Sequence, residues 1–475
     1  MKENLSKKDI YWNYFSKLFS LVSGLITLPL ILMWLSEEEI AVNYLFINII
    51  SYTAIFDLGF SPQLSRNMGF IFGGASDIKS VGFEKSNSNE INYRLVKNVI
   101  SSAKFLYARI SLFVLLLLLT VGTWYVKTTT NGYQVENEII WMWLVFCAIE
   151  TLDFYFRFYT PLLQGKGDIA ELNKIDFISS IAKVITTILF LWLGLRLWAV
   201  IIGMFVRIVI TRIMSVRVLY FKDSLKDKLN GIIIDVNEKR EMIRRLWHNA
   251  RRSAIVQIAS FCTTQMGFLL TGIFLTARDI SSYGLLMQLT LIITGISTSL
   301  SSSVTPIYAQ LRTNNDMAGV KRNFYFTTGL FYILYIMGSL FMVTLCPICL
   351  TLIKANAVLP SLLVTIIYIV YKFLEGQHCI CIYCISSKNK VYDTESATIM
   401  AVATIILLFV SLKYTSYGLF GVVVVQFVVA IVYANWKWPY ELCKDFGDNY
   451  FRVVYNSFKT VAVTSVDNLK KHILK

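Results

Sequence analysis

One stretch decides the fold of this chain: residues 139–163 read IIWMWLVFCAIETLDFYFRFYTPLL. A helix of about 20 such residues crosses a hydrocarbon core of about 30 Å. The stretch also carries Glu150, Asp153 and Arg157 at i, i+3 and i+7, which places the three charges on one stripe of that helix. Because a charge inside a membrane is costly, such a stripe indicates a bundle interior or a wet cavity and not a lipid-facing surface.

Apolar runs of the same length recur through the chain. Of its 475 residues, 56% are hydrophobic and 16% are charged, whereas soluble chains carry roughly 25% charge. Barrel strands would be about ten residues long and would alternate in polarity, which these runs do not. We therefore predict an all-α polytopic membrane protein with about twelve transmembrane helices. The predicted spans are 12–35, 40–65, 101–126, 139–163, 172–193, 197–220, 250–276, 280–309, 324–351, 359–385, 397–412 and 419–438.

The formal net charge of +15 is distributed unevenly between the loops. Lys and Arg gather in alternate loops, a strong positive-inside pattern. It predicts a multi-pass protein of the bacterial inner membrane with both termini cytoplasmic. Attraction of this basic face to anionic lipid head groups explains the charge, so we expect no nucleic-acid partner.

The two halves of the chain resemble each other. One offset of 222 residues superposes Asp153 on Glu375 and Lys166 on Lys388, together with the loops that follow. In the front part of each half, Ser61-Pro62 is similar to Thr305-Pro306. Six spans per half give both copies the same orientation, as in parallel transporter repeats.

This internal repeat predicts four parts. They are an N-terminal six-helix lobe at 1–221, a basic cytoplasmic linker at 222–249, a C-terminal six-helix lobe at 250–440 and a basic cytoplasmic tail at 441–475. The composition of the linker fits either a solvated connection or a helix on the membrane surface.

Polar and ionisable side chains inside the spans are the candidate site. Arg presents a planar fork of donors that matches phosphate oxygens, so cations in a low-dielectric cavity suit an anionic head group. Carboxylates would keep the empty cavity near neutral and could accept a coupling proton. We predict substrate binding by Arg157, Lys183, Arg207, Arg66 and Gln164, and cavity or coupling carboxylates at Asp57, Glu150, Asp153 and Glu375.

Structural roles compete with this interpretation. Polar groups in spans also join helices through hydrogen bonds, and cations near span ends, such as Arg66 and Arg212, can extend towards the interface. His378, Cys381 and Cys384 share a helical face that could hold a metal, although buried thiols usually act as small apolar side chains. We predict no metal and no cofactor. Without a Walker loop or a loop long enough for a catalytic domain, we predict a transporter and not an enzyme.

Five segments carry a family likeness: Leu28-Pro29-Leu30-Ile31, Glu37-Glu38-Glu39-Ile40, Asp57-Leu58-Gly59-Phe60-Ser61, Leu163-Gln164-Gly165-Lys166-Gly167 and Tyr417-Gly418-Leu419-Phe420-Gly421. Together they resemble the Wzx O-antigen flippases among the polysaccharide biosynthesis transporters. The resemblance implies the fold of the multidrug/oligosaccharidyl-lipid/polysaccharide superfamily, in which two MATE-like six-helix lobes face each other around a central cavity.

The same resemblance implies a function. The substrate would be an undecaprenyl-pyrophosphate-linked oligosaccharide repeat, turned from the cytoplasmic to the periplasmic leaflet by alternating access of the lobes. Membrane lipids and other polysaccharide assembly proteins would be partners, and H⁺ or Na⁺ could be the coupling ion. The main alternative is a cation-coupled exporter of small molecules. A membrane-bound polysaccharide polymerase is less favoured, because the longest loops are predicted to be cytoplasmic.

Overall fold

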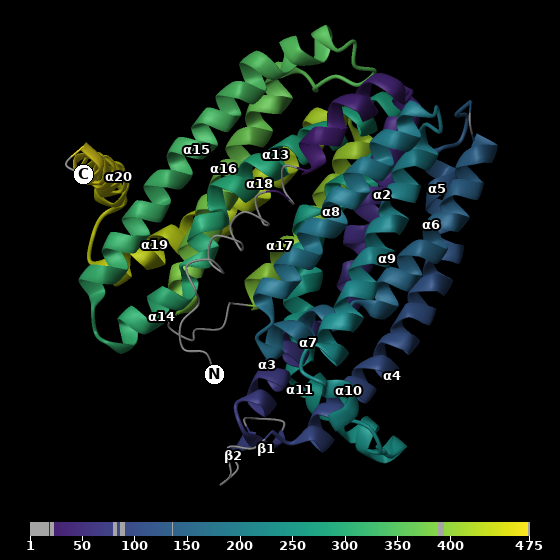
Figure 1. The fold of residues 1–475 in the computed structure, drawn as a ribbon. Coiled ribbons are helices and arrows are strands. Elements are labelled where there is room, and N and C mark those ends of the chain that lie inside the picture. The colour runs from purple at the N-terminus through teal and green to yellow at the C-terminus, as the bar shows by residue number, and fades with distance from the viewer. Residues whose placement is uncertain are drawn as a thin grey trace. The chain divides into compact units, whose positions relative to one another are not determined.

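Helices make up nearly all of the structure, a computed structural model that describes residues 19, 23–78, 83–85, 91–134, 136–387 and 394–473 (Figure 1). The chain divides into two compact units, Met1–Phe261 (unit 1) and Cys262–Lys475 (unit 2).

Unit 1 contains an apolar helix at Ser23–Trp34, followed by α2 (Glu37–Thr53), the 3₁₀ turn η1 (Ala54–Asp57), α3 (Phe60–Phe72), β1 (Ala75–Ile78), β2 (Phe83–Lys85), α4 (Tyr93–Leu117), the π-turn η2 (Leu118–Gly122), α5 (Thr123–Thr129), α6 (Glu136–Phe156), α7 (Tyr159–Lys166), α8 (Ile169–Trp192), α9 (Leu197–Phe221), α10 (Leu225–Lys228) and most of α11 (Val236–Thr264). Strands β1 and β2 form an antiparallel hairpin.

Unit 2 contains α12 (Met266–Phe274), α13 (Ala277–Ser303), α14 (Thr305–Thr313), α15 (Met317–Leu352), α16 (Leu362–Ser386), α17 (Thr394–Tyr414), α18 (Gly418–Val432), α19 (Ala434–Phe446) and α20 (Tyr450–Ile473).

The predicted spans coincide with helices. Within the described residues, eight helical segments are long and apolar enough to cross a membrane, and a ninth is the bent pair Ser253–Thr264 and Met266–Phe274. The three other predicted spans lie on the helices Ser23–Trp34, Leu362–Ser386 and Thr398–Tyr414, and the first of these spans begins outside the described residues. The predicted all-α polytopic fold is confirmed.

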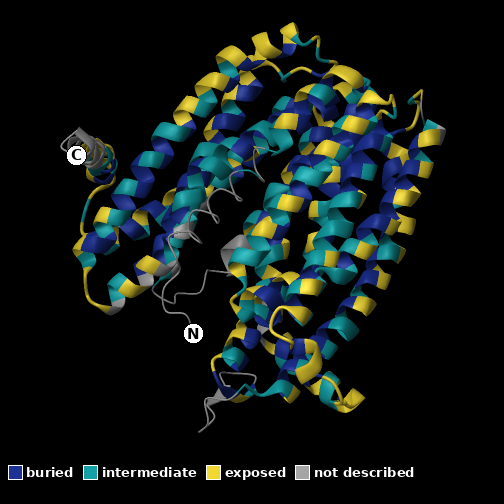
Figure 2. Cartoon of the chain, in the orientation of Figure 1, coloured by how far each residue is buried: buried dark blue, intermediate teal, exposed yellow. Residues whose placement is uncertain are grey.

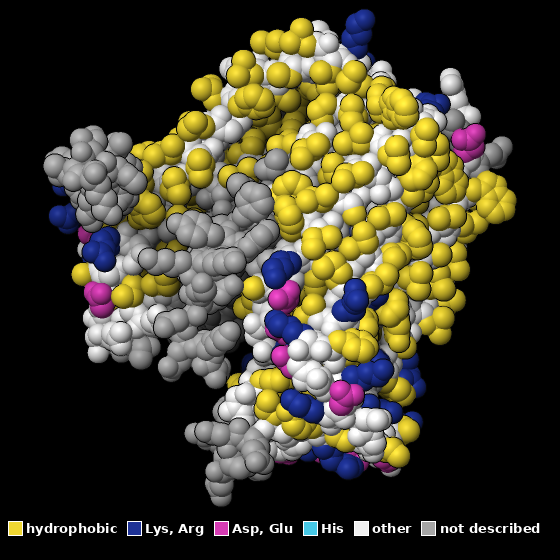
Figure 3. Space-filling model, viewed as in Figure 1, with side chains coloured by type: hydrophobic (Ala, Val, Ile, Leu, Met, Phe, Trp, Pro, Cys, Tyr) yellow, Lys and Arg dark blue, Asp and Glu magenta, His cyan; other side chains and the backbone are white. Residues whose placement is uncertain are grey.

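The surface of these helices is apolar where lipid would contact it. Exposed positions run along α4 and α15 (Figure 2) and include Leu112 and Leu116 on α4 and Met337 and Leu340 on α15. Apolar side chains cover the visible helices of unit 1, whereas charged side chains gather at the end that holds α10 (Figure 3). Such a wide apolar band between polar ends is typical of a membrane-embedded bundle.

Corresponding helices in the two units begin with the same cap. At the start of α2, the Ser36 hydroxyl accepts from the Glu39 N–H at 3.3 Å, and the Glu39 carboxylate accepts from the Ser36 N–H at 2.8 Å. At the start of α13, Thr276 and Asp279 form the same reciprocal pair, with both backbone contacts at 3.3 Å. Each capping box satisfies two backbone donors that would otherwise lack partners in an apolar environment.

Both of these helices are also interrupted near Pro62 and Pro306. Thr53 ends α2, and the chain continues through η1 before α3 begins at Phe60; in unit 2, α13 ends at Ser303 and α14 begins at Thr305. Proline fits the first turn of a helix because it has no N–H to donate. The sequence likeness between Ser61-Pro62 and Thr305-Pro306 therefore marks a broken second span in each unit.

The segments at the ends of the predicted lobes are folded. Residues 222–249 include α10 and the first part of α11, where Arg245 binds Asp77 of β1 at 2.9 Å and Glu241 at 2.6 Å. Residues 441–475 include α20, which packs on α15 so closely that a Cβ added to Gly329 would lie 2.4 Å from the Ser457 carbonyl oxygen. Each segment is therefore packed within its own unit.

Candidate functional site

The charged stripe lies where the fourth predicted span is broken. Helix α6 ends at Phe156, and α7 begins at Tyr159, three residues later. The intervening Arg157 and Phe158 make turn contacts, in which the Arg157 N–H donates to the Phe154 carbonyl at 3.1 Å and the Arg157 carbonyl accepts from Thr160 at 3.3 Å. The break thus places Arg157 at the C-terminal end of an intramembrane helix.

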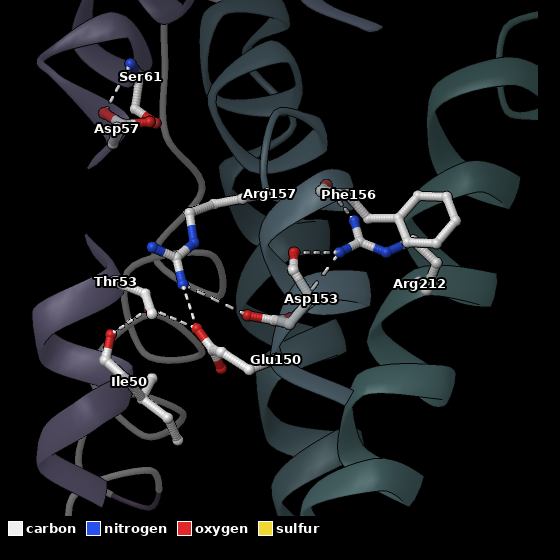
Figure 4. Close-up of polar contacts among 9 residues, drawn as sticks. All are labelled: Ile50, Thr53, Asp57, Ser61, Glu150, Asp153, Phe156, Arg157 and Arg212. Atoms are coloured by element: carbon white, nitrogen blue, oxygen red, sulfur yellow. Dashed lines mark hydrogen bonds and ion pairs between the residues drawn. The ribbon is translucent and has the colours of Figure 1, made fainter. Parts of the chain in front are cut away.

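Four charged side chains and one hydroxyl form what we call the α6 cluster: Glu150, Asp153, Arg157, Arg212 and Thr53 (Figure 4). The guanidinium of Arg157 lies 3.5 Å from the Glu150 carboxylate and 3.6 Å from that of Asp153. Charge-assisted hydrogen bonds are about 2.7–2.9 Å long, so both pairs are loose. Among the described residues, the Arg157 side chain makes no hydrogen bond, and its other contact is the Phe154 ring, 4.9 Å from Cζ. Its donors therefore remain available.

Glu150 lies deepest in the cluster, with 2% of its side chain exposed, compared with 30% for Asp153 and 21% for Arg157. The Thr53 hydroxyl, at the end of α2, lies 2.5 Å from Glu150 Oε1 and 2.8 Å from the Ile50 carbonyl oxygen. The side chain of Glu150 is thus held between α6 and α2.

Arg212 of α9 is bound more tightly than Arg157. Its guanidinium donates to the carbonyl oxygens of Phe156 and, at 3.3 Å, of Asp153, and it stacks 4.4 Å above the Phe156 ring. These carbonyls belong to the last turn of α6, where no later N–H of the same helix donates to them. Arg212 therefore caps α6 and joins it to α9, a stronger structural role than the span-end position that the sequence suggested.

Asp57 lies in the break of the second span and not in the α6 cluster. Its carboxylate accepts from the Ser61 hydroxyl at 2.8 Å, from the Ser61 N–H at 3.1 Å and from the Tyr107 hydroxyl of α4. Leu58 and Gly59 both have positive φ, 49° and 76°. The Asp-Leu-Gly-Phe motif is thus a turn whose aspartate caps α3 and anchors α4.

Lys183 and Arg207 lie on the neighbouring helices α8 and α9. Arg207 binds Asp176 at 2.8 Å, and both side chains are about 40% exposed. Lys183 is half-buried and makes no ion pair or hydrogen bond among the described residues, although Arg207 is near enough for the two charges to interact. Lys183 is therefore a second cation inside a span without a bound counter-charge.

The remaining predicted residues are spread more widely. Arg66 of α3 is exposed and stacks on Phe70 at 5.7 Å, and Gln164 is exposed at the end of α7. Glu375 belongs to unit 2, where it binds Lys372 of the same helix at 2.6 Å. The structure brings together Glu150, Asp153 and Arg157, and places the other six elsewhere.

Two members of these networks, Thr53 and Tyr107, were missed by the sequence analysis. Both contact a carboxylate about 50 to 100 residues away in the chain, and no local pattern predicts such a contact. Among the described residues no three His, Cys, Asp or Glu side chains are grouped like metal ligands. The ring of His378 lies nearly parallel to that of Trp438, with 6.4 Å between the ring centroids.

Comparison with solved structures identifies the fold. The lipid II flippase MurJ in an inward closed conformation is similar with a TM-score of 0.64 and 13% identity, over 98% of this chain and 100% of that one. An outward-facing multidrug resistance MATE family transporter of the MOP superfamily gives 0.58 and 14%, over 94% and 97%. A MOP superfamily transporter from Pyrococcus furiosus gives 0.57 and 15%, over 93% and 97%. The predicted MATE-like fold is confirmed.

Comparison by sequence identifies the family. No curated protein matches the chain. The model of a family described as polysaccharide biosynthesis protein, however, matches residues 71–312, which is more than half of the chain. The predicted likeness to polysaccharide biosynthesis transporters is thereby confirmed, and the chain belongs to the polysaccharide biosynthesis protein family.

Proposed function

We propose that this protein is a flippase that moves undecaprenyl-pyrophosphate-linked oligosaccharide repeat units, of the O-antigen type, from the cytoplasmic to the periplasmic leaflet of a bacterial inner membrane. The observation that carries the proposal is the state of Arg157. It is a partly exposed guanidinium inside a membrane span, in loose contact with two carboxylates. An unsatisfied cation at this depth is costly, and a pyrophosphate would satisfy it.

The cations divide into two groups by their contacts. Arg212 and Arg207 are bound to backbone carbonyls and to Asp176, respectively. Arg157 and Lys183 have no hydrogen-bonded partner among the described residues. We assign the phosphate-binding role to Arg157 and Lys183, and structural roles to Arg212 and Arg207.

Glu150 can gain and lose a proton without losing its contact with Thr53. The Thr53 hydroxyl has one proton and lies within hydrogen-bond distance of both the Ile50 carbonyl and Glu150. An ionised Glu150 competes with Ile50 for that proton, whereas a protonated Glu150 donates to the hydroxyl and lets it donate to Ile50. With Glu150 neutral, the α6 cluster holds two guanidinium groups and one carboxylate, and the extra positive charge favours an anionic head group. We propose Glu150 as the group that couples substrate binding to a proton.

The decisive experiment follows the lipid-linked repeat in cells that lack this gene, with a glycan probe that reaches only one leaflet. We expect single repeats to accumulate on the cytoplasmic leaflet, and to be cleared by the wild-type chain but not by an Arg157→Ala chain present at the same level in the membrane. Arg94→Ala is the matched control, because Arg94 is an exposed cation whose ion pair with Glu238 lies outside the predicted site. Normal surface polysaccharide without a trapped intermediate would contradict the proposal. Export of dyes in that case would favour the small-molecule exporter.

A further inference from the structure

Unit 2 contains a pocket of about 800 Å³ that is separate from the α6 cluster. It lies between α16, α19 and the loop that leads into α20, and its lining includes Gln377, Asn435, Lys444 and Asn449. Pockets of about 300–1,000 Å³ are of the size that holds a small molecule or the head of a larger one. The contacts of these polar side chains indicate what kind of molecule fits.

Two donors of the lining, Lys444 and Asn449, belong to the last turn of α19 and to the loop that follows it. The Oδ1 atom of Asn449 accepts from the Arg452 N–H at 2.8 Å and caps α20, which leaves the amide nitrogen of Asn449 as the free part of that side chain. Lys444 is exposed and forms no ion pair with any described residue. Asn449 and Lys444 thus present donors on one lining.

The acidic side chain of the lining is already neutralised. Asp448 accepts from Lys321 at 3.0 Å and from Tyr325 at 2.9 Å, and Arg452 lies 3.6 Å away. The Lys321 ammonium holds the pKa of this carboxyl below its usual range, so Asp448 stays ionised and paired. With Lys444 unpaired, the lining has excess positive charge and favours an anion.

The rest of the lining is apolar and aromatic. Leu374, Trp436, Pro439 and Tyr440 contribute to it, and Trp436 and Tyr440 are more than half exposed. Trp and Tyr gather where a membrane meets water, because their rings are apolar and their N–H or O–H groups are polar. An acceptor-rich head and an apolar body would both find partners here.

We propose that this pocket binds a membrane lipid through its phosphate group. The phosphate oxygens accept from Asn449 and Lys444 at the end of α19, and the start of the acyl or prenyl chain lies against Trp436 and Tyr440. The inference does not rest on the proposed function, because an ordinary phospholipid carries the same head-group chemistry. A lipid held here would fill the space between α19 and α16 and stabilise unit 2.

The test uses the full-length protein in detergent, with native mass spectrometry to measure retained phosphatidylglycerol. Asn449→Asp keeps the acceptor that caps α20 but replaces the free donor with a negative charge. We expect Asn449→Asp and Lys444→Ala each to weaken retention about tenfold, the loss of one charge-assisted contact of about 1.4 kcal/mol. Lys437→Ala, on the same helix but outside the pocket, is the matched control and should retain the lipid as the wild type does.

Cys443, which also lines the pocket, reports on occupancy directly. Peptide-resolved labelling with a maleimide should slow at Cys443 when phosphatidylglycerol is added, and should not slow at Cys349 on α15. Equal protection by diacylglycerol, which lacks phosphate, would overturn the proposal in favour of a purely apolar groove. Equal protection of Cys443 by glycerol phosphate at the same concentration would overturn it in favour of a soluble ligand. If Lys437→Ala lost as much lipid as Lys444→Ala, the retention would depend on the general surface charge and not on this pocket, which would also overturn the proposal.

Discussion

Arg157 and Arg212 lie on either side of Asp153 (Figure 4) and differ in their partners. Arg212 satisfies two carbonyls at the end of α6, so Arg212→Ala should lower the free energy of unfolding by about 1–3 kcal/mol. Arg157→Ala removes only loose contacts and should leave stability nearly unchanged while abolishing translocation. Thermal unfolding of both variants in detergent, beside the cellular glycan assay, separates the two roles. Equal melting temperatures for the two variants would contradict this assignment.

The double contact of Thr53 makes a second prediction at this scale. Glu150→Gln is permanently neutral and can donate to the Thr53 hydroxyl, so the protein should fold normally. If Glu150 carries a coupling proton, translocation into proteoliposomes should be slow at every pH of a series and should lose its pH dependence. Glu238→Gln, which alters an exposed pair with Arg94, is the control. An unchanged pH profile in Glu150→Gln would exclude Glu150 as the coupling group.

The sequence predicted the site only in part. The spacing of Glu150, Asp153 and Arg157 on one helix was sufficient to place them together, because a single helix fixes their geometry. The same reasoning could not show that Asp57 faces Ser61 and Tyr107, since that contact depends on a helix break and on the packing of α4. Nor could it distinguish Arg212 from Arg157, because both are Arg residues in spans and only the tertiary contacts differ.

At the scale of elements, the turn at Leu58 and Gly59 is the most constrained point of unit 1. A Cβ on Gly59 would lie 2.6 Å from the Ser253 Cβ of α11, in addition to the strain of its positive φ. Gly59→Ala should therefore destabilise the protein by more than about 2 kcal/mol. Gly132 has a similar φ of 82° but no atom within 4 Å of an added Cβ, so Gly132→Ala should cost only about 1 kcal/mol. The yield of monodisperse protein in detergent and the melting temperature measure the effect of both variants. Equal losses in Gly59→Ala and Gly132→Ala would show that the contact of Gly59 with α11 is unimportant.

A second element-scale prediction concerns the attachment of α20. Asp448 joins the start of α20 to Lys321 and Tyr325 of α15, and its pKa is depressed chiefly by Lys321. Because the pKa of Asp448 is lower in the folded state, the ionised carboxylate stabilises this attachment fully at pH values above the unfolded-state pKa. The stabilisation is lost as the pH falls through the folded-state pKa. Acidification in that range should increase hydrogen exchange in residues 449–458. Asp448→Asn should give that exchange already at neutral pH, and no difference between it and the wild type would contradict the role of Asp448.

The sequence predicted well where helices lie, but it did not predict where a span is divided into two helices. Apolar length identified every span for which the structure describes a helix, because a membrane helix must satisfy its own backbone. The breaks after Asp57 and after Phe156 escaped prediction, since both segments are apolar enough on average to form one continuous span. The turn at Leu58 also requires a left-handed conformation that leucine rarely adopts.

At the scale of the whole molecule, the charge pattern predicts on which side of the membrane each loop lies. The loop at Gly132 should face the periplasm, and the loop at Gly231, between α10 and α11, should face the cytoplasm. Both glycines are exposed with open space around them, so each loop should accept a short epitope tag. We expect antibody to label the tag at 132 in intact spheroplasts and the tag at 231 only after permeabilisation. The reverse pattern would invert the proposed direction of transport.

The break between α6 and α7 has an electrostatic consequence for the whole protein. At this break the last carbonyl oxygens of α6 lack helical N–H donors inside a membrane span, where the medium screens their partial negative charge poorly. Arg212 supplies the compensating charge whether or not cargo is present. Arg157, at the same helix end, is therefore not needed to satisfy these carbonyls and faces Glu150 and Asp153 across loose contacts. An anionic guest can thus take up its donors without uncapping α6.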